Sequence, residues 1–279
     1  MAKLITLLIL SCIAVLNAQT SFTHLDESAA RDLAVARGTF VVIDFYANWC
    51  GPCKVMDEEV WSQDTVRSLQ AKFVNIRIDA STSNVGLKRY GIDAIPALII
   101  MDANGSEYFR KVGYMQQPEV LELLNRFPDD MRGAYAADVV VKQEKDAFNS
   151  HFLRARHYQR AARTAAGSVA GRLASASNAS LEDARDILAR NTSQPESLLQ
   201  YLDLMEAENL LLKGRAKKAL KALAAIGEDV HDKHQALACY LRSVAYRKTG
   251  KPELAQDCYE QLLEAEGNEE YLVLYEEKR

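Results

Sequence analysis

The feature that most constrains the fold of this 279-residue chain is a change of sequence pattern near residue 128. Up to Phe127, short apolar runs typical of buried strands alternate with helical stretches. Beyond residues 128–133 no strand pattern recurs, and Ala, Leu, Glu, Lys and Arg follow one another at helical spacing. At roughly 150 residues per domain, the length fits two units. We therefore expect an α/β unit followed by an all-α unit.

The first unit alternates strands and helices in the order expected for a central sheet with helices on both faces. Asn104-Gly105 is a strong hairpin signal between the last two strands. Asp26 is a residue type that caps helices, and the helix expected after it carries Leu33 and Val35. Strands are expected at residues 40–46, 73–79, 97–101 and 107–112, and further helices at 53–61, 65–72 and 118–126.

The N-terminus predicts export from the cytoplasm. Lys3 precedes an apolar run from Leu4 to Leu16, which is shorter than the roughly 20 residues that span a bilayer. This pattern fits a secretory signal peptide, and Ala18 is a small residue suited to cleavage. Two alternatives stay open, namely a buried N-terminal helix and lipid anchoring at Cys12, whose surroundings loosely resemble a bacterial lipobox. An exported chain works where disulfides persist.

Charge and cysteine content exclude two classes of protein. The net charge is −4 and the pI about 5.8, so we do not expect a nucleic-acid binder that works by bulk charge. Five cysteines are too few for a disulfide-stapled scaffold of this length.

The last third of the helical region contains a sequence repeat of 36 residues. The repeat aligns Ala207, Leu210, Gly214, Ala219 and Leu223 with Ser243, Tyr246, Gly250, Ala255 and Tyr259. Small residues allow paired helices to approach, and the glycine allows the turn between them. The pattern resembles the tetratricopeptide repeat, whose usual period is about 34. A generic bundle of helical hairpins is the alternative, because solenoids normally need about three units and two are clear.

A Cys-Gly-Pro-Cys motif follows the apolar strand at 40–46 and opens a helix. Cys50 falls at the helix N-terminus, where unpaired backbone N–H groups and the helix dipole favour a thiolate. A thiol with a pKa near 8.5 is only about 3% ionised at pH 7, whereas one with a pKa near 7 is about half ionised. Cys53 can reach back to close a small disulfide, and Pro52 fits the first helical turn. The motif therefore predicts thiol–disulfide chemistry.

The residues around this motif resemble the thioredoxin family, over roughly residues 20–127. Asp44 lies six residues before Cys50 inside an apolar strand, where the family keeps a buried carboxylate. Ile95-Pro96 precedes the third strand, at the place of the family's cis-proline. The resemblance implies a thioredoxin-like fold with a redox-active cysteine pair.

Two further segments support the same resemblance. Gly113, after the last strand, matches the family's glycine near the substrate groove, and residues 59–66 look closer to periplasmic thiol:disulfide interchange domains of the DsbD type than to cytosolic thioredoxin. We therefore expect a signal peptide at 1–18, a thioredoxin-like domain at 20–127, a linker at 128–136 and a tetratricopeptide-like helical domain at 137–279.

The resemblance implies a catalytic role for three residues. Cys50 would attack a substrate cystine, and Cys53, expected to be the more buried sulfur, would then attack Cys50 and release the reduced substrate. Asp44, kept partly protonated by burial, would take the proton from Cys53, directly or through water. A purely structural, hydrogen-bonded Asp44 is the alternative.

The resemblance also implies a substrate groove beside the cysteines. Pro96, in the cis form and facing the disulfide, would shape this groove; an ordinary trans proline at the start of a strand is the alternative. Trp49 would pack beside the cysteines. The expected groove residues are Trp49, Gly51, Pro52, Ile95, Pro96 and Gly113.

The sequence departs from the family at two positions near the buried acid. Tyr46 stands where thioredoxin usually has a tryptophan, and Asn75 occupies the place of a lysine that often neighbours the acid. Neither change removes the chemistry, but both leave the redox potential open. Half of a zinc site and a static disulfide are alternatives for the cysteine pair, although no second Cys-x-x-Cys or His pair is suitably spaced in this domain.

Three features of the helical region each admit two interpretations. Cys239 and Cys258 either form a structural disulfide or are two small buried residues. His231 and His234 have the spacing of metal ligands on one turn but also fit a solvated helix start. Five arginines without an acid between residues 148 and 180 suit either an acidic partner or a solvated helix face. They are Arg154, Arg156, Arg160, Arg163 and Arg172.

Together these patterns predict a secreted or periplasmic thiol–disulfide oxidoreductase that exchanges Cys50–Cys53 with protein cystines. Gly-Pro between the cysteines favours a reductant, which outside the cytoplasm needs a membrane electron donor of the DsbD type. We expect no cofactor besides the redox-active disulfide, no metal and no nucleic acid, with protein docking through the helical domain. The alternatives are an interaction protein in which the thioredoxin-like domain is a docking clamp, and a disulfide oxidase or isomerase.

Overall fold

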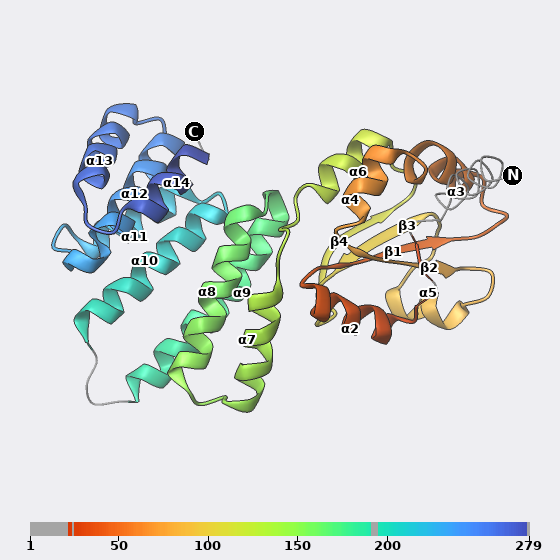
Figure 1. Ribbon diagram of the computed structural model, residues 1–279, viewed down its shortest axis with the longest axis horizontal. Coiled ribbons are helices and arrows are strands. Elements are labelled where there is room, and N and C mark those ends of the chain that lie inside the picture. Colours follow the sequence, from red (N-terminus) through yellow and green to blue (C-terminus); the bar gives the residue numbers. More distant parts are fainter. Residues whose placement is uncertain (1–21, 24, 191–194, 278–279) are drawn as a thin grey trace, which may run out of the picture. The chain divides into compact units, whose positions relative to one another are not determined.

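The computed structural model describes residues 22–23, 25–190 and 195–277, and the predicted signal peptide and Cys12 lie outside them (Figure 1). The chain divides between residues 125 and 126 into two compact units, which we call the sheet unit and the helical unit. Within the described residues, no helix combines the length and apolar character that crossing a membrane requires.

The sheet unit is built on four strands in the order β2-β1-β3-β4. β1 pairs in parallel with β2 and antiparallel with β3, which pairs antiparallel with β4. In this register Asp44 on β1 lies opposite Arg77 on β2 and Leu98 on β3. The four predicted strands are confirmed with nearly unchanged bounds: β1 Val41–Tyr46, β2 Val74–Asp79, β3 Ala97–Met101 and β4 Glu107–Val112.

Helices cover both faces of this sheet, with α2 and α5 on one side and α3, α4 and α6 on the other (Figure 1). Their bounds are α2 Glu27–Arg37, α3 Gly51–Met56, the π-helix η1 Asp57–Trp61, α4 Asp64–Gln70, α5 Asn84–Tyr90 and α6 Gln117–Leu124. α5 is not among the predicted helices, because its seven residues are too few to establish a helical period.

Asp26 caps α2 as predicted, because its carboxylate accepts a hydrogen bond of 2.8 Å from a backbone N–H of the first turn. The helix buries Ala30 and Ala34, whereas Leu33 and Val35 are exposed. The small alanine side chains allow the helix to lie close against the sheet. The apolar residues that suggested this helix are therefore not the ones that hold it in place.

The helical unit consists of helices alone over its described residues. α7 begins inside the segment 128–136 that the sequence analysis assigns to a linker, because Asp130 accepts a hydrogen bond of 2.9 Å from the backbone N–H of Arg132. The bounds are α7 Arg132–Gln143, α8 Phe148–Thr164, α9 Gly167–Ala189, α10 Glu196–Leu212, α11 Ala216–Ile226, α12 Asp232–Lys248, α13 Pro252–Glu264 and α14 Glu269–Glu277.

The 36-residue repeat coincides with two helix pairs. α10 and α12 begin at residues 196 and 232, and α11 and α13 begin at 216 and 252, so both pairs are offset by 36 residues. Gly214 and Gly250 separate the two helices of each pair with φ of 71° and 75°, the left-handed region that favours glycine. The repeat thus corresponds to two equivalent helical hairpins, and its tetratricopeptide character stays a prediction.

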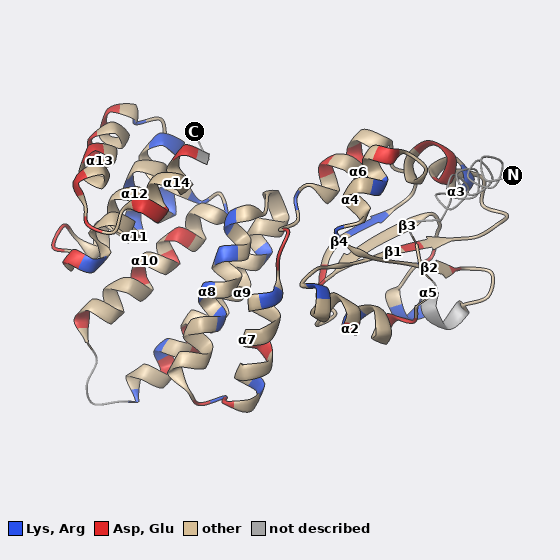
Figure 2. Ribbon diagram, in the orientation of Figure 1, with Lys and Arg blue, Asp and Glu red and all other residues tan. Residues whose placement is uncertain are grey.

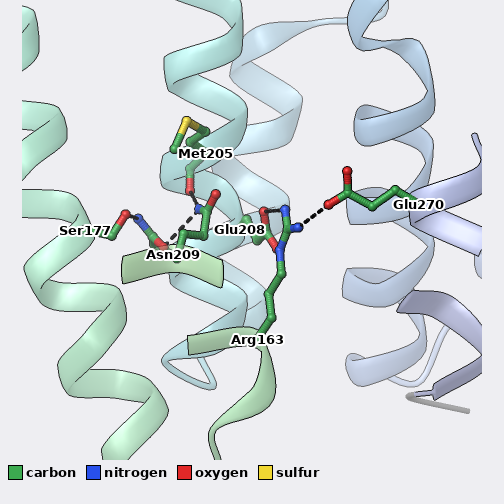
Figure 3. Close-up of polar contacts among 7 residues, drawn as sticks. Arg163, Ser177, Met205, Glu208, Asn209 and Glu270 are labelled. Carbon is green, nitrogen blue, oxygen red and sulfur yellow. Dashed lines mark hydrogen bonds and ion pairs between the residues drawn. The ribbon is translucent and has the colours of Figure 1, made fainter. Parts of the chain in front are cut away.

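A largely buried polar cluster joins α8, α9, α10 and α14, in which Asn209 of α10 also donates to Ser177 of α9 at 2.9 Å (Figure 3). Arg163 on α8 donates two hydrogen bonds to Glu208 on α10, of 2.6 and 2.9 Å, and one of 2.7 Å to Glu270 on α14. Beside this pair, Gln159 on α8 donates to the side chain of Asn209 on α10 at 3.0 Å. The cluster therefore fixes α8 against α10 by directional contacts between buried groups.

The arginines between residues 148 and 180 serve different purposes. Arg163 belongs to the cluster above, and Arg154 donates a hydrogen bond of 2.6 Å to Asp138 on α7. Arg156 and Arg160 are exposed, and basic side chains follow one another along α8 (Figure 2). The internal ion pairs explain two of the arginines, and both interpretations stay open only for the exposed ones.

The cysteines and histidines of the helical unit have structural roles. Cys239 on α12 and Cys258 on α13 are buried free thiols, so the disulfide alternative is not formed here. His231 accepts a hydrogen bond from the backbone N–H of Lys233 and caps α12. Within the described residues, no group of three or more His, Cys, Asp or Glu is placed to hold a metal ion.

Candidate active site

Cys50 and Cys53 form a disulfide where β1 leads into α3, with an S–S distance of 2.02 Å and a Cα–Cα distance of 5.3 Å. Cys50 is the N-cap residue of α3, and its Sγ accepts a hydrogen bond of 3.2 Å from the backbone N–H of Cys53. Pro52 lies in the first turn, where its missing N–H leaves no bond unmade. The local structure thus brings both sulfurs to a helix N-terminus, which stabilises a Cys50 thiolate once the pair is reduced.

The two sulfur-bearing residues are almost equally buried, with 4% exposure for Cys50 and 3% for Cys53. The expected difference in burial is therefore small. Ala47 belongs to the same buried cluster, and Tyr46, Ala80 and Ile95 pack against it. Since Gly51 and Pro52 are exposed, they form the open surface next to the disulfide.

The predicted groove residues are only partly brought together. Ile95-Pro96 is a cis peptide bond, and Ile95 packs against the cysteine cluster. Gly113 has a φ of 101°, and its N–H donates a hydrogen bond of 2.8 Å to the Pro96 carbonyl. Trp49, by contrast, is 71% exposed and donates from its indole N–H to Ser81 at 3.0 Å. Most of its ring faces solvent rather than packing beside the cysteines.

Asp44 is buried in β1 and paired with Arg77, a residue that the sequence analysis does not single out. The Arg77 Nε and Nη2 atoms lie 2.8 and 2.7 Å from Asp44 Oδ2, and Nη2 also contacts Asp57 of η1. Burial raises the pKa of Asp44 to about 6; Arg77 opposes this rise and Asp57 adds to it. The carboxyl therefore titrates close to neutral pH, as a proton acceptor for a thiol requires.

The positive charge beside Asp44 comes from Arg77 and not from the position at which the family often has a lysine. Asn75, which stands in the place of the family's lysine, lies opposite Val42 and donates to the backbone carbonyl of Gln70 at 2.8 Å. Arg77, two residues further along β2, projects on the same side and pairs with Asp44 instead. Arg77 could have been predicted as a candidate, because it is a charged residue that alternates with apolar residues in a strand. No sequence pattern predicts the π-helix that carries Asp57.

A mixed four-stranded sheet with a disulfide at a helix N-terminus and a cis-proline before the third strand defines the thioredoxin-like class of fold and site. The family model described as "Thioredoxin-like domain" matches residues 28–128. A thioredoxin of Mycoplasmoides gallisepticum is 33% identical over 104 residues, which cover 36% of this chain and 97% of that protein. The chain therefore belongs to the thioredoxin family.

Two DsbD proteins are also similar to this chain. The thiol:disulfide interchange protein DsbD of Yersinia pestis is 29% identical over 102 residues, which cover 34% of this chain and 17% of that protein. The crystal structure of the reduced DsbD C-terminal domain of Neisseria meningitidis matches with 27% identity and a TM-score of 0.31, covering 34% of this chain and 89% of that one. The family model and the matching thioredoxin show that the chain contains a thioredoxin-like thiol–disulfide oxidoreductase domain. About two thirds of its length lies outside each of these matches.

Proposed function

We propose that this protein is an exported protein-disulfide reductase in which Cys50 attacks substrate cystines. The observation that carries the proposal is the Cys50–Cys53 disulfide at the start of α3, in the same unit as a buried carboxyl that titrates near neutral pH. Gly-Pro between the cysteines supports the reducing direction, and the apolar N-terminal run supports export.

The reaction proceeds in two exchanges. The Cys50 thiolate attacks one sulfur of a substrate disulfide; a Cys50–substrate bond forms, the substrate disulfide breaks, and one substrate thiolate leaves. The Cys53 thiol then gives its proton to Asp44 and attacks Cys50 Sγ, which forms the Cys50–Cys53 disulfide and releases the second thiolate. The substrate gains two electrons and the protein loses two. A dithiol donor, which we place at the membrane, restores the reduced pair.

The helical unit has a separate part in this proposal. Its repeated hairpins, α10 with α11 and α12 with α13, support a role in docking proteins beside the reactive domain. The competing function is that of an interaction protein in which the sheet unit holds partners without turnover.

Reduction of insulin disulfides by the full chain, supplied with a dithiol, tests the proposed activity. We expect catalysis in the wild type and at least a hundredfold loss in Cys50→Ser, because the attacking thiolate is gone. Cys239→Ser is the matched control, since it removes a buried thiol outside the active site. Equal rates for wild type and Cys50→Ser would favour the interaction protein.

The redox potential of the pair decides the direction of electron flow. We expect a value near that of thioredoxin, about −270 mV, rather than near the oxidant DsbA, about −120 mV. A Cys53→Ser variant, which cannot complete the second exchange, should retain substrates as mixed disulfides in the native compartment. Their recovery from outside the cytoplasm, together with processing of the N-terminus, tests export.

A further inference from the structure

A buried arginine clamps the acid that the proposed reaction uses as its proton acceptor. Arg77 reaches Asp44 from β2 and Asp57 from η1, and its side chain is only 13% exposed. Its guanidinium carbon lies 4.8 Å from the centre of the Phe22 ring and 4.4 Å from that of Tyr46. Two carboxylates and two aromatic rings therefore fix one guanidinium in a single place.

The clamp occupies only one oxygen of the acid. Both contacts from Arg77, through Nε and Nη2, fall on Asp44 Oδ2. Among the contacts that the structure describes, none joins Arg77 to Oδ1. Arg77 thus holds the carboxyl by one oxygen and leaves the other oxygen out of its own contact.

We propose that Arg77 is a positioning residue for thiol–disulfide exchange: it keeps the Asp44 carboxyl ionised and fixed through Oδ2, so that Oδ1 can take the proton of the Cys53 thiol. This inference rests on the proposed function, because it concerns the second exchange of that reaction. The proton moves from Cys53 Sγ to Asp44, the Cys53 electron pair forms the bond to Cys50 Sγ, and the substrate sulfur leaves with the electron pair of the mixed disulfide.

The charges around Asp44 determine in which direction each substitution should shift its pKa. Arg77 faces the acid from β2 and Asp57 acts on it from η1, while β3 places the apolar Leu98 opposite it. Burial raises the pKa of Asp44, Arg77 lowers it and Asp57 raises it. Losing Arg77 should therefore leave the buried acid protonated at neutral pH, whereas losing the Asp57 charge should make it ionise more readily.

Asp57 lies where α3 passes into η1. It is the first residue of η1 and keeps α-helical backbone angles, with a φ of −63° and a ψ of −43°. Its carboxylate contacts the guanidinium, although its side chain is 39% exposed. It can therefore be changed without opening a cavity.

The test compares the rate of the second exchange between variants of the chain. The reduced full chain is mixed with an aromatic disulfide that releases a coloured thiolate at each exchange, first when Cys50 attacks and then when Cys53 displaces the mixed disulfide. The rate of the second phase is recorded across pH for the wild type, Arg77→Met, Arg77→Lys and Asp57→Asn. A chain with both Cys50 and Cys53 changed to Ser supplies the background of the other thiols.

We expect the midpoint of the second phase to rise by at least one pH unit in Arg77→Met. The rate should fall at least about twofold at pH 7 and about tenfold at pH 5, because one pKa unit changes the ionised fraction about tenfold only well below the pKa. Arg77→Lys should recover part of this rate, and Asp57→Asn should lower the midpoint. Equal or parallel shifts in Arg77→Met and Asp57→Asn would overturn the inference. If Arg77→Met does not fold, the midpoint of Arg77→Lys decides: it should lie above that of the wild type, and an unchanged midpoint would overturn the inference.

This experiment separates the inference from the proposed function. Absence of a second coloured release in the wild type would refute the exchange mechanism itself. A normal wild-type release with an unchanged midpoint in Asp57→Asn and the Arg77 variants would refute the role of Arg77 and leave the exchange mechanism in place.

Discussion

The sheet unit and the helical unit each bury an arginine between two carboxylates. Both arginine side chains are 13% exposed, both have a partner acid that is 3% exposed, and both have a second acid that is partly open to solvent. The sheet unit uses Arg77 with Asp44 and Asp57, and the helical unit uses Arg163 with Glu208 and Glu270.

The two arginines meet their buried acids differently. Arg163 donates to both oxygens of Glu208, whereas Arg77 places two donors on a single oxygen of Asp44. Two parallel hydrogen bonds to two oxygens compensate a buried charge better than one hydrogen bond and one ion-pair contact to a single oxygen. The helical unit therefore has a pair that holds helices together, and the sheet unit has an acid whose ionisation is poorly compensated. The same components thus give a structural contact in one unit and, in the proposed mechanism, a proton acceptor in the other.

Replacing Glu208 should have the largest effect on stability. Glu208→Gln leaves Arg163 buried without its bidentate partner, and breaking such a pair costs about 3–5 kcal/mol. Urea unfolding followed by far-ultraviolet circular dichroism should show this loss in the helical unit. Tryptophan fluorescence supplies the control, because Trp49 and Trp61 both lie in the sheet unit. An unchanged unfolding transition of the helical unit would show that the Arg163–Glu208 pair does not stabilise it.

Replacing Asp44 should raise the stability of the fold at neutral pH, whereas replacing Glu208 should lower it. The carboxyl titrates near 3.8 when exposed and at about 6 in the fold, so its ionised form is the disfavoured one there. Below pH 4 the acid is protonated in both states; between pH 4 and 6 the unfolded state ionises first, and the folded state loses about 3 kcal/mol of relative stability.

Asp44→Asn keeps the shape of the protonated acid, so it should be about 3 kcal/mol more stable than the wild type at pH 7 and equally stable below pH 4. Fluorescence-detected unfolding at both pH values measures the difference. The variant should also lose most of the second exchange rate, because Asn cannot take a proton. A destabilised Asn variant at pH 7 would show that Arg77 compensates Asp44 as fully as Arg163 compensates Glu208.

The sequence predicts one of these two clusters in part and the other not at all. An acid inside an apolar strand six residues before Cys50 marks Asp44, because a carboxylate in that setting is costly and needs a reason. Glu208 carries no such mark, since acids are ordinary in a helix with helical spacing of Leu and Ala. Its burial depends on how α8 packs against α10, which the local pattern does not contain.

The same distinction applies to the fold around the site. Strands and the helix cap at Asp26 follow from alternation, apolar runs and local hydrogen bonding, so they are predictable within a residue or two. The partner of Asp44 depends on strand register, which places Arg77 rather than Asn75 beside it. The contact from Asp57 depends on how the start of η1 packs against β2, which the local sequence pattern does not contain.

The smallest effects on stability should come from replacing the two partly exposed acids, Asp57 and Glu270. Because both replacements should cost about the same stability, they allow the two arginine clusters to be compared by their effect on the exchange reaction alone. Asp57→Asn and Glu270→Gln each remove one solvent-exposed partner, with 39% and 61% exposure, so each should cost less than about 1 kcal/mol of unfolding free energy. Of these two variants, only Asp57→Asn should shift the pH profile of the second exchange, because only the Asp57 carboxylate acts on Asp44. A shift of equal size in Glu270→Gln would mean that the profile reports general stability rather than the charge at Asp44.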